Sequence, residues 1–155
     1  MKQQAGVRRS LNLDAILLIY LWIVMAGLLL QGSGSLALRL SPQLEAITPP
    51  LLAGIFLGHI PHAILHIVWG ATGMLVLATL RSNRERLVLG LSFGIFYTLL
   101  AIYGTIDNNA LGLHLVFAEN GFHLIVGPLT LGLSLLTWFT QFRDSHTQKE
   151  QLPSL

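Results

Sequence analysis

The sequence has no cysteine and few charged residues, and both absences narrow the range of functions. Without cysteine the chain forms no disulfide, offers no thiolate to a metal and has no nucleophilic thiol. Only 10% of its 155 residues are charged, against roughly 25% in soluble proteins. It also lacks a phosphate-cradling glycine loop and a dinucleotide fingerprint. These absences favour a membrane protein over a soluble enzyme.

Long apolar runs are what the sequence does contain. The hydrophobic share is 53% and the mean hydropathy is +0.66, and a membrane-spanning helix needs about 20 apolar residues. The first run is long for the apolar core of a signal peptide, so we expect a retained helix. We predict a single all-α domain, an integral membrane four-helix bundle over residues 1–155. Its predicted parts are spans at 11–30, 60–80, 87–103 and 121–142, outer loops at 31–59 and 104–120, and a polar tail at 143–155.

Small and polar residues predict where these helices begin and end. Glycine and serine in Gln31–Ser35 are expected to end the first helix. Pro61 suits the first turn of the second helix, where its missing N–H costs nothing, and Asn120 suits the N-cap of the fourth. Gly90 and Gly94 are spaced to allow close helix contact.

The basic residues predict the orientation in the membrane. Cytoplasmic loops are enriched in lysine and arginine. With four spans, one basic residue, Arg39, falls on the outer side and the other eight fall on the inner side. Both termini are therefore predicted to be cytoplasmic. Since the basic residues flank apolar runs, the pI near 9.4 indicates a lipid bilayer partner and no nucleic acid. The eight are Lys2, Arg8, Arg9, Arg81, Arg84, Arg86, Arg143 and Lys149.

Histidines open the second and fourth predicted helices in a similar pattern. His66 and His123 are each followed by glycine four residues later, at Gly70 and Gly127. Four residues before them stand His62 and Glu119, and each unit follows a long outer loop. The pattern predicts two duplicated helical hairpins of the same topology.

The segment from Ala118 to His123, followed by Gly127, resembles the start of the fourth helix in a family of small uncharacterised bacterial four-helix integral membrane proteins. That family has a pattern like Ala-Asp-Asn-x-Leu-His-x-x-x-Gly there, and a similar His-x-x-x-Gly on its second helix. In this chain Glu119 replaces the usual aspartate, and His59 is additional. The resemblance implies the fold and topology and assigns no chemistry.

Three interpretations of the histidines remain open. In the first they are structural, and a pair such as His66–Glu119 or His62–Glu119 closes the bundle. In the second, His66 and His123 bind haem or chlorophyll, with Gly70 and Gly127 leaving room for the macrocycle. The aromatic side chains expected to line that macrocycle are Trp69, Tyr103 and Phe122.

In the third interpretation, His62, His66, Glu119 and His123 bind a Zn, Cu or Fe ion at the outer face. Histidines at i and i+4 share one helix face, but soluble di-iron bundles use an i, i+3 spacing instead. The remaining histidines near the helix starts, His59 and His114, are predicted in the outer loops.

The sequence favours a non-enzymatic role over catalysis, because few polar groups lie outside the membrane. We expect an accessory or interaction subunit of a larger membrane assembly, respiratory or photosynthetic, in a bacterial inner or thylakoid-type membrane. Its expected partners are other membrane protein subunits. A cofactor-binding protein and a metal-dependent membrane enzyme are the alternatives.

Overall fold

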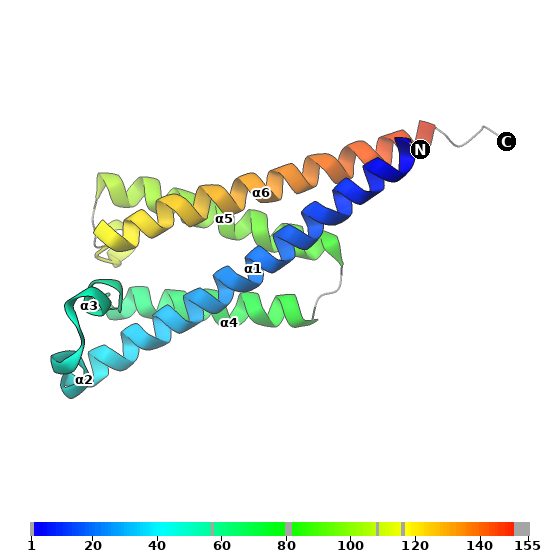
Figure 1. The fold of residues 1–155 in the computed structure, drawn as a ribbon. Helices are drawn as coiled ribbons and strands as arrows, with labels where there is room; N and C mark the ends of the chain where they lie inside the picture. Colours follow the sequence, from blue (N-terminus) through cyan, green and yellow to red (C-terminus); the bar gives the residue numbers. More distant parts are fainter. Residues whose placement is uncertain (1, 57, 80–81, 108, 116, 151–155) are drawn as a thin grey trace.

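The structure is a computed structural model that describes residues 2–56, 58–79, 82–107, 109–115 and 117–150. Four long helices dominate it (Figure 1). Two short helices follow the first of them, and a short 3-10 helix precedes the last. In chain order the elements are α1 (Lys2–Leu40), α2 (Pro42–Ile47), α3 (Pro50–Phe56), α4 (Ile60–Thr79), α5 (Asn83–Ile106), η1 (Ala110–Gly112) and α6 (Phe117–Glu150).

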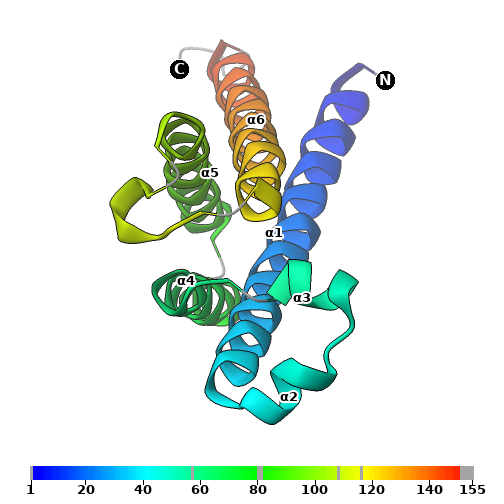
Figure 2. The same ribbon diagram turned by 90° about the vertical axis from the view of Figure 1, so that its left-hand side faces the viewer.

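All four long helices are long and apolar enough to cross a membrane. The prediction of an all-helical protein with four helices suited to spanning a membrane is therefore confirmed. The long helices alternate in direction, so the start of α1, the end of α4, the start of α5 and the end of α6 lie at one end of the molecule (Figure 1). The short elements α2, α3 and η1 lie at the other end, beside the starts of α4 and α6 (Figures 1 and 2). This second end is called the loop end below.

The predicted end of the first helix near residue 30 is wrong, because α1 continues to Leu40. The glycines in the segment permit close packing. A Cβ at Gly32 would lie 2.6 Å from the Ala63 carbonyl oxygen of α4, and one at Gly34 would lie 2.8 Å from the Phe56 ring of α3. Ser35 is buried and its hydroxyl donates to the Phe56 carbonyl oxygen. The segment predicted as a break is thus a helical contact surface.

Other predicted boundaries also shift outward. The α5 helix begins at Asn83, because Ser82 and Glu85 form a capping box there. The α6 helix begins at Phe117, which places Asn120 in its first turn and makes its prediction as the N-cap wrong. At the far end α6 continues to Glu150, so most of the predicted tail is helical. The last residue predicted for the second span, Leu80, and the end of the tail at 151–155 lie outside the described residues.

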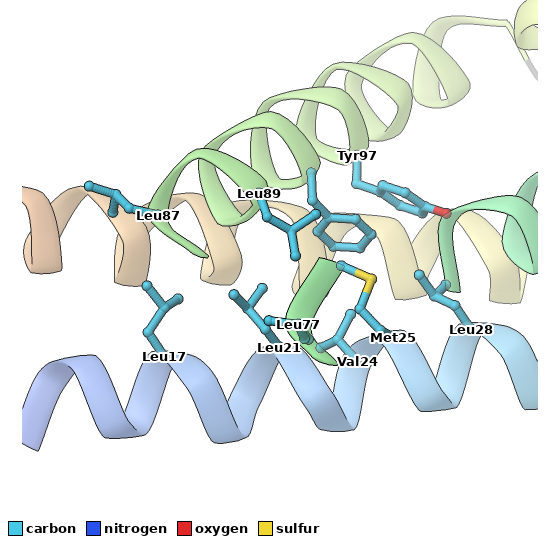
Figure 3. Close-up of a cluster of buried hydrophobic side chains, with 10 residues drawn as sticks. Leu17, Leu21, Val24, Met25, Leu28, Leu77, Leu87, Leu89 and Tyr97 are labelled. Carbon is cyan, nitrogen blue, oxygen red and sulfur yellow. The ribbon is translucent and has the colours of Figure 1, made fainter. Parts of the chain in front are cut away.

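The main apolar cluster lies between α1, α4 and α5. On α1 its members recur every three or four residues, so they share one face of the helix. Figure 3 shows this face directed toward the leucine and aromatic side chains of α4 and α5. The cluster consists of Leu17, Leu21, Val24, Met25, Leu28, Leu77, Leu87, Leu89, Phe93 and Tyr97.

Glycines bring the helices into pairs. The most extensive helix contacts join α1 to α4 and α5 to α6. A Cβ at Gly94 would lie 2.6 Å from the Leu131 nitrogen, and one at Gly90 would lie 2.4 Å from the Ser134 hydroxyl. The prediction that these two glycines allow close helix contact is confirmed. Close approach matters here because helices in lipid associate mainly through packing rather than through apolar burial from water.

Candidate metal centre

Three histidine side chains meet at the loop end, between the starts of α4 and α6. His62 lies in the first turn of α4 and His66 in the second, on the same face. His123 lies in the second turn of α6, one turn after Glu119. The three histidines are at most 2% exposed and Glu119 is 6% exposed. The four residues predicted as metal ligands are therefore brought together in the interior of the protein.

His123 Nε2 lies at ligand-like distances from the ring nitrogens of both His62 and His66. His123 Nε2 lies 3.3 Å from His62 Nε2 and 3.4 Å from His66 Nε2. The metal-binding atoms of the three rings all fall within 4.8 Å of one another. A tetrahedral ion with metal–nitrogen bonds of 2.0–2.1 Å separates its nitrogen ligands by about 3.3–3.4 Å. Both distances from His123 match that separation.

The opposite ring nitrogens of two histidines face oxygen acceptors. His62 Nδ1 lies 2.9 Å from the Glu119 carboxylate oxygen Oε1. His66 Nδ1 donates to the side-chain oxygen of Gln31, on α1. An acceptor at Nδ1 keeps the proton there, so the lone pair of a neutral ring lies at Nε2. Both lone pairs therefore point toward His123.

In this arrangement His123 Nε2 faces two acceptor nitrogens, from His62 and His66, and carries at most one proton. A neutral His123 with its proton on Nε2 can donate a full hydrogen bond to His62 or to His66, and the other ring then faces it without a proton. A cation at the centre accepts all three lone pairs at once. Acceptors behind metal-binding histidines are a regular feature of metal sites, because they fix the tautomer and the orientation of the ring.

The Glu119 carboxylate packs closely against the backbone of Gly58. A Cβ at Gly58 would lie 2.1 Å from Glu119 Oε1, so the backbone of Gly58 leaves no space for a side chain. The Gly58 carbonyl oxygen accepts a hydrogen bond of 3.0 Å from Arg39 Nε. Arg39 also forms an ion pair of 3.7 Å with Glu45. The end of α1 therefore positions the segment that packs against the carboxylate.

The residues aligned by the sequence repeat face each other across the centre. His62 aligns with Glu119, and these two are in contact. His66 aligns with His123, and their Nε2 atoms are 3.4 Å apart. Equivalent residues meet in this way when they lie near a two-fold axis between two copies of a unit. The most extensive helix contacts join α1 to α4 and α5 to α6, and the duplication of the two hairpins stays a prediction.

Gly70 and Gly127 contact neighbouring helices instead of leaving an open space. A Cβ at Gly70 would lie 2.6 Å from the Leu29 nitrogen of α1, and one at Gly127 would lie 2.6 Å from the Thr98 nitrogen of α5. These backbones occupy the room expected for a macrocycle at the two glycines.

The other histidines and aromatic residues named above are more dispersed. The rings of His59 and His114 lie 4.9 Å apart, and both residues are exposed. Phe122 approaches the His66 ring at 6.3 Å, and Trp69 packs against the rings of α5. Tyr103 is 57% exposed, so it does not line the centre. Tyr97 does so instead, at 5.0 Å from the His123 ring.

Gln31, Gly58 and Tyr97 were not expected at the centre. Gln31 falls in the segment predicted as a break, although it lies half-buried on α1 one turn after the buried Leu28. Tyr97 stands in the third apolar run, and no motif around it indicates a role at the centre. No pattern in the sequence around Gly58 indicates its role, because that role depends on the carboxylate of Glu119, 61 positions later.

Comparison with models of protein families, with curated proteins and with solved structures finds no match. The resemblance to small four-helix membrane proteins stays a prediction.

Proposed function

We propose that this protein is an integral membrane metal-binding protein whose ion is held by His62, His66 and His123. One observation carries the proposal: three buried ring nitrogens converge, with His123 Nε2 at 3.3 and 3.4 Å from the other two. The acceptors behind His62 and His66 support it, because they leave both Nε2 lone pairs directed inward.

The ligand set favours zinc, with copper next. Imidazole suits Zn, Cu, Fe and Ni, and the nitrogen spacing suits the tetrahedral geometry of zinc. Non-haem iron sites commonly use two histidines and a directly bound carboxylate. Here the carboxylate contacts the far nitrogen of His62, at 2.9 Å. Glu119 is therefore assigned to positioning and charge balance.

A tetrapyrrole is less well supported at the same residues. Two axial histidines on opposite faces of a haem hold their nitrogens roughly 4 Å apart, with the macrocycle between them. The separation of 3.4 Å between His66 and His123, with His62 beside both, leaves no place for that plane. The role of accessory subunit in a respiratory or photosynthetic assembly rests on sequence alone. Both roles stay predictions, as do the cytoplasmic termini and the outer position of the centre.

Metal analysis of the purified protein tests the proposal. Protein extracted in mild detergent is expected to hold about one equivalent of zinc or copper, since the three histidines form one site. His62→Ala and His123→Ala should lose that metal. His114→Ala is the matched control, because this exposed histidine should leave the metal content unchanged. Equal metal content in all four proteins would reject the site. Metal-free wild-type protein that also takes up no zinc on addition would leave a structural hydrogen-bond network as the role of the cluster.

A further inference from the structure

The two short helices that follow α1 expose large apolar side chains. On α2, Leu44 is 45% exposed and Ile47 is 76% exposed. On α3, Leu51 is 78% exposed and Leu52 is 45% exposed. Within the described part of residues 42–56, Gln43 is the one exposed polar side chain. Leu44, Ile47, Leu51 and Leu52 are called the α2–α3 surface below.

The polar groups next to this surface are bonded within the protein. Arg39 donates to the Gly58 carbonyl oxygen at 3.0 Å and pairs with Glu45 at 3.7 Å. The buried Ser35 hydroxyl donates to the Phe56 carbonyl oxygen. The sequence has no charged residue between Glu45 and His59. A loop in water shows the reverse pattern, in which charged side chains are exposed and large apolar ones are packed inside.

The backbone of the two short helices also needs little water. Lipid tolerates backbone groups only when they are bonded within the protein. Pro42 and Pro50 begin α2 and α3, and proline has no N–H to leave unpaired in a first turn. At the end of α2, the Thr48 N–H donates to the Glu45 carbonyl oxygen at 3.2 Å, and its hydroxyl donates to the Leu44 carbonyl oxygen at 2.6 Å.

The position of the segment makes lipid the medium that covers this surface. The apolar span of α1 ends at Leu40 and the next span begins at Ile60, so α2 and α3 connect two spans at one end of the molecule (Figures 1 and 2). Leu40 is itself 70% exposed, and α2 begins two residues later. The apolar exterior of the α1 span therefore continues directly onto the α2–α3 surface. Amphipathic segments at a membrane surface bury their apolar side about 5–10 Å deep, at the boundary of headgroups and acyl chains.

We propose that α2 and α3 lie in the plane of the membrane interface, with the α2–α3 surface in contact with lipid acyl chains. The connection predicted from the sequence as an outer loop is then a membrane-inserted element. The proposal depends on the membrane spans and is independent of the metal ion.

Spin labels at single introduced cysteines test this position, because the chain has no cysteine of its own. Ile47→Cys and Leu51→Cys are labelled with a nitroxide and reconstituted in phosphatidylcholine vesicles. Electron paramagnetic resonance then compares collisions of the nitroxide with oxygen, which concentrates in lipid, and with a water-soluble nickel chelate. Both labels should give a ratio of oxygen to nickel collisions several-fold higher than Asn109→Cys, the matched control, because Asn109 is an exposed polar residue directly before η1. Their ratio should approach that of Ile23→Cys, which is 66% exposed within the α1 span.

Two results would overturn the proposal. Nickel collisions as frequent as at Asn109→Cys would place the α2–α3 surface in water. Few collisions with either reagent would show that protein, such as a second copy of this chain, covers the surface. Leu44→Cys and Leu52→Cys provide two more positions on the same surface, and a circular dichroism spectrum that matches the wild type shows that each variant is folded.

Discussion

Replacing Glu119 with glutamine tests the effect of its negative charge on metal binding while its size and shape stay nearly the same. Glutamine keeps an oxygen that can accept from His62 Nδ1, now 2.9 Å from the carboxylate, and it has nearly the same size. The change therefore removes one negative charge and leaves the His62 ring in place. Metal affinity should fall because the carboxylate no longer offsets the charge of the ion.

The geometry sets the size of this loss. Adding the width of an imidazole ring and one metal–nitrogen bond to the 2.9 Å contact places the carboxylate about 7 Å from the ion. A charge of −1 at that distance attracts a divalent ion by about 1 kcal/mol in water and about 5 kcal/mol at an effective dielectric of 20. Loss of a partner behind a metal ligand typically weakens affinity by about 10- to 100-fold, or about 1.4–2.7 kcal/mol. We expect Glu119→Gln to fall within that interval.

Competition between the protein and a chromophoric chelator for Zn²⁺ measures this change. Glu119→Ala should weaken zinc binding more than Glu119→Gln, because it also removes the acceptor at His62 Nδ1. Glu45→Gln is the matched control: it removes a half-exposed carboxylate that pairs with Arg39 and should leave zinc affinity unchanged. If Glu119→Gln binds zinc as tightly as the wild type, Glu119 does not balance the charge of the ion. If Glu119→Ala does so too, Glu119 does not support His62 either.

Four further changes test neighbouring parts of the account. Gln31→Ala removes the acceptor at His66 Nδ1 and should weaken zinc binding about 10- to 100-fold in the same competition assay. Gly58→Ala places a Cβ 2.1 Å from the present position of Glu119 Oε1, so it should displace the carboxylate from His62 and weaken zinc binding in the same assay. Gly127→Leu forces α6 away from Thr98 and should lower the free energy of unfolding in detergent by about 1–3 kcal/mol or more. Acidification should release the metal, because imidazole binds only when neutral; a metal content that stays constant as the pH falls would contradict histidine ligation.

The sequence was sufficient to predict the membrane helices, because their length and hydropathy are local properties. It also identified the four polar residues of the centre from two spacings, His62 to His66 and Glu119 to His123. The spacing shows which residues share a helix face, but not whether two faces meet. That meeting depends on how α4 and α6 pack against α1 and α5.

The ends of the helices were harder to predict from the sequence, because glycine has different effects in water and between packed helices. Glycine ends a helix in water partly because it exposes backbone and loses conformational freedom. Between packed membrane helices the same residue removes a side chain and lets two backbones approach. Gly32 and Gly34 belong to the second case, so α1 continues through the segment where a break was predicted. Because α1 continues through this segment, the side chain of Gln31 lies in contact with His66.

X-ray absorption at the zinc edge tests the central claim most directly. For the purified protein the account predicts three imidazole nitrogens at about 2.0–2.1 Å from the ion, with outer-shell scattering from their rings, and loss of this zinc signal in His123→Ala. A first shell of oxygen atoms without imidazole scattering, or a spectrum that His123→Ala leaves unchanged, would contradict the three-histidine site.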